Sequence, residues 1–467
     1  MTRMYCVLYN VHVHRKTHVQ YEGLGMGDPI KTQAKITDSN TATSYTGPEK
    51  TFTINMAPSK SKHAGGGKNN VYLTEKHLLG FDKYKYSAVD TSPVSIYIMH
   101  PFWNAVVKMF PEWVAPNLLT FVGFLILVLS FIILSIVDWS YKASSRLHPQ
   151  YETIPNVLFL LLGIGQFVAH TLDGIDGKQA RRTNSSTPLG ELFDHGSDSI
   201  IACLLPMGVY SIFGRSGDDF GANVWVLYLI VCVVMATFYI SHWEKYLTGV
   251  MFLPWVYDVS QLTLALLYVV TSILGYEIWK GSHIFGFEFR YLFTLTVIGG
   301  SILSSIPTTV WNVYLSYRDG TGKNRSLYAA LEPAISPTIL LGTLTLWAAL
   351  SPIAILQREP RLFCLTVGIT MSNICCRLII SQMTDTKAET LNWLLSPVVG
   401  VAVVSLGFGI GETEVHLLYG LTALVVLAHV HFGVNVVSEL ADHFNIHVFS
   451  LVKRAPKSSR MTNGAKK

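Results

Sequence analysis

Long apolar runs separated by short polar connections are the most regular feature of the sequence. Ten such runs recur along the chain, at 117–137, 155–175, 192–213, 223–241, 259–279, 291–314, 332–350, 362–383, 391–410 and 415–437. A helix of about twenty residues crosses the hydrocarbon core of a bilayer, whereas a strand of a membrane barrel needs only about ten residues of alternating polarity. Because only helices and closed barrels satisfy their backbone in lipid, the pattern predicts an all-α polytopic membrane protein with about ten transmembrane helices.

Two polar segments precede the first run and differ in character. Residues 71–116 mix aromatic residues, prolines and charges, which predicts one or two interfacial amphipathic helices lying on the bilayer. Residues 1–70 contain no hydrophobic core of a signal peptide and are rich in Thr, Ser, Lys, Gly and Asn, so we expect a disordered N-terminal extension. The sequence leaves the translation start open between Met1 and Met56.

The remainder of the chain is expected to form three parts. A transmembrane core at 117–320 contains the acidic motif described below, C-terminal transmembrane helices occupy 321–440, and a tail follows at 441–467. Charged residues make up only 14% of the 467 residues, against about a quarter in soluble domains, which supports the membrane assignment. The net charge of +5 is modest and lies mostly in tails and loops, which argues for membrane topology rather than nucleic-acid binding.

Lysine and arginine are distributed unequally between the two sets of loops. Placing the N-terminus in the cytosol gives that side of the membrane the basic residues Lys178, Arg181, Arg182, Lys245, Arg318, Lys323, Arg325 and Lys387. The tail adds further basic residues to the same side, and the opposite loops carry fewer. Since basic residues concentrate in cytoplasmic loops, both termini are predicted to be cytosolic.

Four aspartates, Asp173, Asp176, Asp194 and Asp198, stand where two apolar runs face each other across a short loop. Carboxylates at a membrane boundary are costly unless a cation or another strong partner accompanies them. On helices, Asp173 and Asp176 share one face, and Gly190, Asp194 and Asp198 share another because they repeat every four residues. Two helices meeting along these faces would gather the carboxylates, and oxygen ligands without Cys or His predict Mg²⁺ or Mn²⁺.

Small residues accompany the carboxylates. Gly177, Ala180 and Arg181 continue the face of the first two aspartates, and Gly177 and Ala180 leave room for a ligand or a helix to approach the backbone. Four carboxylates would overload one Mg²⁺, so two metal ions bridging a diphosphate fit better. The alternative from another class is a cation-coupled membrane transporter in which the carboxylates line an ion pathway; the small residues and Arg181 favour a phosphate-bearing ligand.

A histidine lies within the same motif. Glu191 and His195 are four residues apart, on a face adjoining Asp194 and Asp198. A carboxylate at this spacing can hold the imidazole tautomer and raise its basicity, which makes His195 a candidate general base toward an alcohol. Asp198 is the rival base if it is not fully committed to metal, and the choice stays open.

The motif as a whole resembles that of a known family. Its residues read Asp173-x-x-Asp176-Gly177-x-x-Ala180-Arg181, eight further residues, and Gly190-x-x-x-Asp194-x-x-x-Asp198. They match the full signature of the class I CDP-alcohol phosphotransferase family at every fixed position. The resemblance extends through Trp113–Thr120, His242–Gly249 and Leu253–Trp255, which are similar to eukaryotic choline and ethanolamine phosphotransferases, and is most like the ethanolamine branch at Phe81–Asp90 and His100–Trp103.

The resemblance implies a reaction of the Kennedy pathway. The hydroxyl of diacylglycerol would attack the β-phosphorus of CDP-ethanolamine, giving phosphatidylethanolamine and CMP. It also implies that Asp173, Asp176 and Asp194 bind one metal ion and that Asp198 joins the second. The remaining site residues would be Arg181 on the nucleotide phosphates, Asn117 on the nucleotide, Gly177, Ala180 and Gly190 lining the substrate site, and His195 as proton acceptor with Glu191 behind it.

The head group is the alternative left open within the family. A trimethylammonium favours an aromatic cage, whereas a primary ammonium needs hydrogen-bond acceptors, and the sequence does not locate either pocket. A cholinephosphotransferase or a dual choline/ethanolamine enzyme using CDP-choline therefore remains the alternative. The resemblance implies a multi-pass protein of the endoplasmic reticulum and/or Golgi with its active site facing the cytosol, and it is compatible with a homodimer.

Overall fold

The computed structural model describes most of the chain beyond the N-terminal region. The described residues are 52–53, 70–145, 148–215, 221–253, 256–280, 283–284, 286–452 and 454. The extension expected at 1–70 lies almost entirely outside them, as do residues 254–255 of the segment Leu253–Trp255 and the last residues of the tail.

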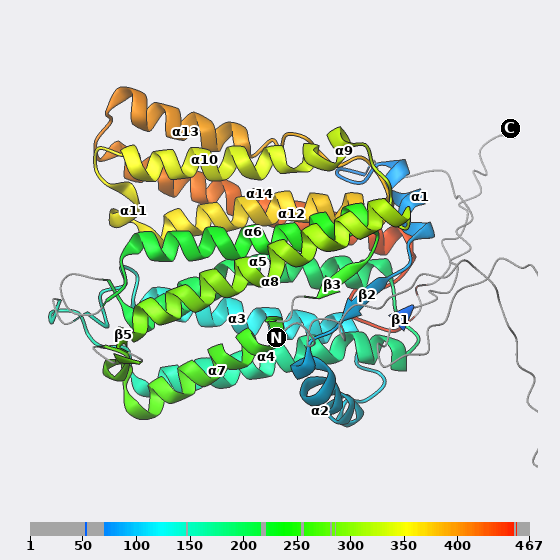
Figure 1. Cartoon of the computed structure of the whole chain (residues 1–467), viewed down its shortest axis with the longest axis horizontal. Coiled ribbons are helices and arrows are strands. Elements are labelled where there is room, and N and C mark those ends of the chain that lie inside the picture. The colour runs from blue at the N-terminus through cyan, green and yellow to red at the C-terminus, as the bar shows by residue number, and fades with distance from the viewer. Residues whose placement is uncertain are drawn as a thin grey trace, which may run out of the picture. The chain divides into compact units, whose positions relative to one another are not determined.

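Within the described part of the chain, nine helical segments are long and apolar enough to cross a membrane. They are α3 (Pro116–Val137), α4 (Asn156–Arg182), α5 (Pro188–Phe213), α6 (Val224–Thr248), α7 (Tyr257–Leu274), α8 (Phe289–Asp319), α9 with η4 and α10 (Leu327–Leu331, Glu332–Ala334 and Ile335–Leu350), α12 (Pro360–Thr384) and α14 (Thr413–His443). The all-α membrane fold predicted from the apolar runs is confirmed, and Figure 1 shows these helices running side by side.

The ninth apolar run forms a shorter helix than expected. Helix α13 (Leu395–Phe408) has 14 residues, which span only about 21 Å at 1.5 Å per residue. The segment from Thr390 to Glu414, which contains α13, nevertheless runs along most of α10. Ser336 at the start of α10 donates to the Thr390 carbonyl, and Trp347 near its end donates to Glu414. The ninth apolar run is therefore only partly helical, which periodicity alone does not reveal.

Short elements surround the bundle. They are α1 (Glu75–Lys83), η1 (Ser95–Met99), α2 (His100–Val106), η2 (Val107–Met109), η3 (Tyr276–Trp279), α11 (Ile355–Arg358) and the strands β1 (Phe52–Thr53), β2 (Ser87–Asp90), β3 (Met251–Leu253), β4 (His283–Ile284) and β5 (Phe287–Glu288). Strand β2 pairs with β1 in antiparallel and with β3 in parallel orientation. The segment 71–116 thus contains helices α1 and α2, as its composition predicts; their placement on a bilayer stays a prediction.

The two helices of the acidic motif begin and pack as their sequences dictate. Pro188 occupies the first turn of α5, and the Thr187 side chain accepts from the Gly190 backbone N–H as an N-cap, an arrangement that favours the start of a helix at this position. Helix α4 packs against α3 and α7, while α5 packs against α3, α6 and α12. The loop between α4 and α5 therefore holds the two halves of the motif at one end of the bundle.

Candidate active site

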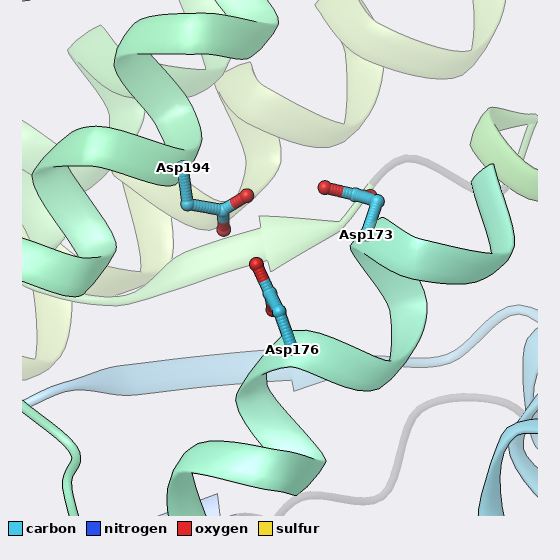
Figure 2. Close-up of side chains that lie close together, drawn as sticks. All are labelled: Asp173, Asp176 and Asp194. Carbon is cyan, nitrogen blue, oxygen red and sulfur yellow. The ribbon is translucent and has the colours of Figure 1, made fainter. Parts of the chain in front are cut away.

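Three of the four aspartates converge. Asp173 and Asp176 project from α4 and Asp194 from α5, and Figure 2 shows their carboxylates turned toward one another. One carboxylate oxygen from each lies within 4.8 Å of the others. Asp194 Oδ1 is buried and has no hydrogen-bond partner among the described residues. Converging carboxylates with an unsatisfied buried oxygen are costly without a compensating charge, and this donor set could hold a metal ion.

The fourth aspartate lies apart from this cluster. Asp198 follows Asp194 by one turn of α5 and lines the same cavity, but in the described chain it is not within the group of three. Helical spacing alone would gather all four carboxylates at one point, whereas the structure groups three of them with Asp198 as a neighbour. This is the division that the family resemblance implies for two metal ions, and the binding of those ions stays a prediction. Spacing along a helix identifies a shared face, whereas convergence also depends on how the two helices are placed against each other.

Hydroxyl groups from other helices orient two of the clustered carboxylates. Thr120 of α3 donates a hydrogen bond to Asp176 Oδ2, and Tyr257 of α7 donates to Asp173 Oδ2 over 3.2 Å. Such outer partners fix the orientation of ligating carboxylates. Sequence reasoning did not assign either role, because a hydroxyl at the start of an apolar run carries no distinguishing signal.

A second buried pair lies beside Asp173. His170, one turn earlier on α4, is 3.3 Å from the Asp258 carboxylate of α7, and Ser95 of η1 donates to the other oxygen of Asp258. The Trp103 indole packs so closely on Gly174 that any Cβ there would overlap it. These contacts hold α7 and the segment 71–116 against the end of α4 that carries the motif.

Glu191 has different partners from those expected. Its Oε1 accepts from Lys245 Nζ at 2.5 Å and from the Tyr84 hydroxyl at 2.6 Å, rather than holding the His195 imidazole. Burial and the nearby Glu191 carboxylate raise the pKa of Tyr84, which keeps its hydroxyl protonated as a donor. The Lys245 ammonium also lies over the rings of Tyr84 and Tyr86, 5.6 and 5.1 Å from their centres.

The Glu191–Lys245 ion pair corrects the expectation that Lys245 lies in a loop. The charge pattern placed Lys245 in a loop, but α6 continues to Thr248 and buries Lys245 against Glu191. A buried lysine needs a partner of opposite charge, and Glu191 supplies it. The ion pair ties α5, α6 and the segment before the first span together at the edge of the site.

His195 is buried on α5 and lines the cavity beside Asp198. Its ring centre lies 5.2 Å from that of His242, which in turn is hydrogen-bonded through Nδ1 to Gln382 Nε2 at 3.2 Å. Both candidate proton acceptors, His195 and Asp198, thus reach the same space, and the choice between them stays a prediction.

The predicted substrate-binding residues all line one cavity. Its volume is about 860 Å³, and it contains the carboxylate cluster together with Asn117, Gly177, Ala180, Arg181 and Gly190. Asn117 Nδ2 donates to the Val448 carbonyl at 3.0 Å. The remainder of the cavity is predominantly apolar and is lined mainly by residues of α5, α6 and α8, among them Leu205, Ile230, Phe293 and Val297. A polar ligand and an apolar ligand can thus bind next to each other in the same cavity.

Comparison with known proteins agrees with this geometry. The family model for CDP-alcohol phosphatidyltransferase matches residues 113–304, and mouse Ethanolaminephosphotransferase 1 is 49% identical over 84% of this chain and 96% of its own length. The chain belongs to the CDP-alcohol phosphatidyltransferase family. Other members are more distant: Choline/ethanolaminephosphotransferase 1 of Arabidopsis thaliana is 30% identical over 82% of this chain and 99% of its own, and Cholinephosphotransferase 1 of Xenopus laevis is 32% identical over 81% and 90%.

Family membership decides between the two classes of protein considered from the sequence, a transferase and a cation-coupled transporter. Members are membrane transferases that use a CDP-alcohol, a lipid acceptor and divalent metal ions, and the carboxylate cluster with its mixed cavity suits that chemistry. A cation-coupled transporter is not favoured.

Proposed function

We propose that this protein transfers phosphoethanolamine from CDP-ethanolamine to diacylglycerol, forming phosphatidylethanolamine and CMP. The observation that carries the proposal is the cluster of Asp173, Asp176 and Asp194 in a cavity whose lining is predominantly apolar. The 49% identity to mouse Ethanolaminephosphotransferase 1 favours the ethanolamine head group. The alternative is a cholinephosphotransferase or a dual enzyme, since relatives with those names are about 30% identical.

Two divalent ions, Mg²⁺ or Mn²⁺, suit the oxygen ligands of the site. Asp173, Asp176 and Asp194 would hold one ion, and Asp198, one turn away in the same cavity, would contribute to the second. When bound, such ions neutralise the diphosphate and make CMP a competent leaving group. The hydroxyls of Thr120 and Tyr257 hold the carboxylates of Asp176 and Asp173 in place.

The remaining residues position the donor and move one proton. The diacylglycerol oxygen forms a bond to the β-phosphorus, the bond from that phosphorus to the bridging oxygen breaks, and CMP leaves with the bonding electrons. The proton of the attacking hydroxyl passes to His195, with Asp198 as the alternative acceptor. Arg181 holds the nucleotide phosphates and Asn117 contacts the nucleotide. Glu191, bound to Lys245, keeps the segment before the first span closed over this site.

The acceptor lipid fits the apolar part of the cavity. Side chains of α5, α6 and α8 line it, and because lipid tails are about as apolar as such side chains, acyl chains can pass from the bilayer into this space at little cost in solvation free energy. The glycerol hydroxyl would then reach the carboxylate cluster from the membrane side, while the soluble CDP-alcohol enters from the water side.

The donor side of the site is the cytosol in this proposal, and the membrane is that of the endoplasmic reticulum or Golgi. Arg182 and Arg318 lie in the last turns of α4 and α8, and Lys323 and Arg325 follow the end of α8. An excess of such residues marks cytosolic loops. This orientation also suits a charged, water-soluble donor.

The head group is tested by giving purified protein both donors. In detergent with diacylglycerol and Mn²⁺, equimolar CDP-ethanolamine and CDP-choline carrying different radiolabels are expected to yield mainly phosphatidylethanolamine. The labelled lipids are separated and counted. Equal or greater formation of phosphatidylcholine would replace the ethanolamine assignment by the dual or choline alternative.

A further inference from the structure

The chain turns back over the site after its last helix. Helix α14 ends at His443, Asn445 adopts a left-handed conformation with φ of 55°, and the Ile446 N–H donates to the Ala441 carbonyl at 3.0 Å. A left-handed residue after a helix redirects the backbone. The following residues, 446–452, which we call the C-terminal strap, therefore leave the helix axis.

An aromatic side chain anchors the C-terminal strap between α3 and α5. The Phe449 ring centre lies 5.1 Å from that of Phe121 and 5.8 Å from that of Phe193. Phe121 follows Thr120, the hydrogen-bond partner of Asp176, and Phe193 precedes Asp194. The strap thus packs on the two helices directly behind the metal-binding residues.

The backbone of the C-terminal strap fixes the amide of Asn117. The Val448 carbonyl accepts from Asn117 Nδ2 at 3.0 Å, and since a carbonyl can only accept, the amide nitrogen must face the strap. The amide oxygen then faces α5, where a Cβ on Gly190 would lie 3.2 Å from it. Asn117 and Gly190 both line the cavity, so a hydrogen-bond acceptor of fixed orientation faces the ligand space.

We propose that the C-terminal strap is part of the nucleotide site and selects the base by holding the Asn117 oxygen toward the cavity. An acceptor at this position pairs with a base edge that carries an amino group, as cytosine does, and opposes the carbonyl that uracil carries instead. Phe449 is a positioning residue, since it acts by seating Val448 against Asn117. This inference rests on the proposed use of a cytidine nucleotide.

The test measures nucleotide binding without turnover. The affinities of the full chain for CMP and for UMP are determined by calorimetry in detergent with Mn²⁺, in the wild type and in Phe449→Ala. Loss of the aromatic contacts is expected to weaken CMP binding about fivefold and to affect UMP less, so that the ratio of the two affinities falls. Phe449→Tyr, which keeps the ring, is expected to retain the wild-type ratio.

A matched control lies outside the strap and the cavity. Phe408, the last residue of α13, is 77% exposed, and Phe408→Ala is expected to leave both affinities unchanged. Phe449→Leu, which keeps apolar bulk without the ring, should show a smaller fall than Phe449→Ala and guards against misfolding of the alanine variant. Unchanged CMP affinity in Phe449→Ala and Phe449→Leu, or an equal loss of affinity for CMP and UMP, would overturn the inference. Failure of the wild type to make phospholipid would instead overturn the proposed function, because binding of CMP needs neither head group nor acceptor.

Discussion

Asp173→Asn is expected to lower the rate of CMP release from CDP-ethanolamine by on the order of 10³-fold, because several kcal/mol of electrostatic stabilisation at the phosphates would be lost. The substitution is isosteric, and its amide oxygen can still accept the Tyr257 hydrogen bond that Asp173 accepts at 3.2 Å. The loss should therefore arise from the missing negative charge rather than from local repacking. The Mn²⁺ concentration for half-maximal activity, measured by CMP release, is expected to rise.

Asp319→Asn serves as the control for this substitution. Asp319 forms an ion pair with Arg318 at the end of α8, at 2.7 Å, and exposed pairs of this kind contribute only about 0–1 kcal/mol. Its rate and Mn²⁺ requirement should match those of the wild type. An Asp173→Asn variant with the wild-type Mn²⁺ requirement would remove Asp173 from the metal site.

His195→Ala is expected to lower kcat by about 10²–10⁴-fold, the usual contribution of a general base, while leaving the binding of CDP-ethanolamine intact. His195 lines the cavity beside Asp198 but is not one of the three clustered carboxylate residues. The substitution should therefore spare the Mn²⁺-dependent affinity for the donor, which calorimetry measures. A loss of kcat without a loss of donor affinity is expected for His195→Ala, whereas Asp173→Asn is expected also to raise the Mn²⁺ requirement.

His416→Ala is a suitable comparison, because His416 is exposed on the first turns of α14 and bonds only the Glu412 carbonyl among the described residues. Its turnover should equal that of the wild type. If His195→Ala also turned over at the wild-type rate, proton acceptance would pass to Asp198, and Asp198→Asn would then be the variant that loses kcat.

The helical spacing of the aspartates predicts which side chains share a face, and in the structure Asp173, Asp176 and Asp194 meet. Spacing alone does not separate Asp198 from this group, since that depends on the placement of α4 against α5; the separation is what the family resemblance implies. The hydroxyls of Thr120 and Tyr257 come from helices far away in the sequence. Their roles follow only from the packing of α3 and α7 on α4.

The sequence pattern does not locate polar residues near the ends of apolar runs. The charge pattern predicts that Lys245 lies in a loop, yet α6 continues through it, and Glu191 neutralises it inside the protein. The partner expected for Glu191 was four residues away on its own helix, but a lysine from α6 reaches it instead. Spacing along the sequence indicates which side chains can contact each other within one helix. It does not indicate whether a side chain from another helix binds there instead.

The most direct measurement of the central claim follows both products of one reaction. Purified protein in detergent with Mn²⁺, diacylglycerol and CDP-ethanolamine labelled in its ethanolamine group is sampled over time, and CMP and labelled phosphatidylethanolamine are quantified. Transfer at the Asp173, Asp176 and Asp194 cluster predicts that the two rise in equal amounts and that neither forms when a chelator removes the metal. Absence of CMP release, or CMP release without labelled lipid, would contradict the account.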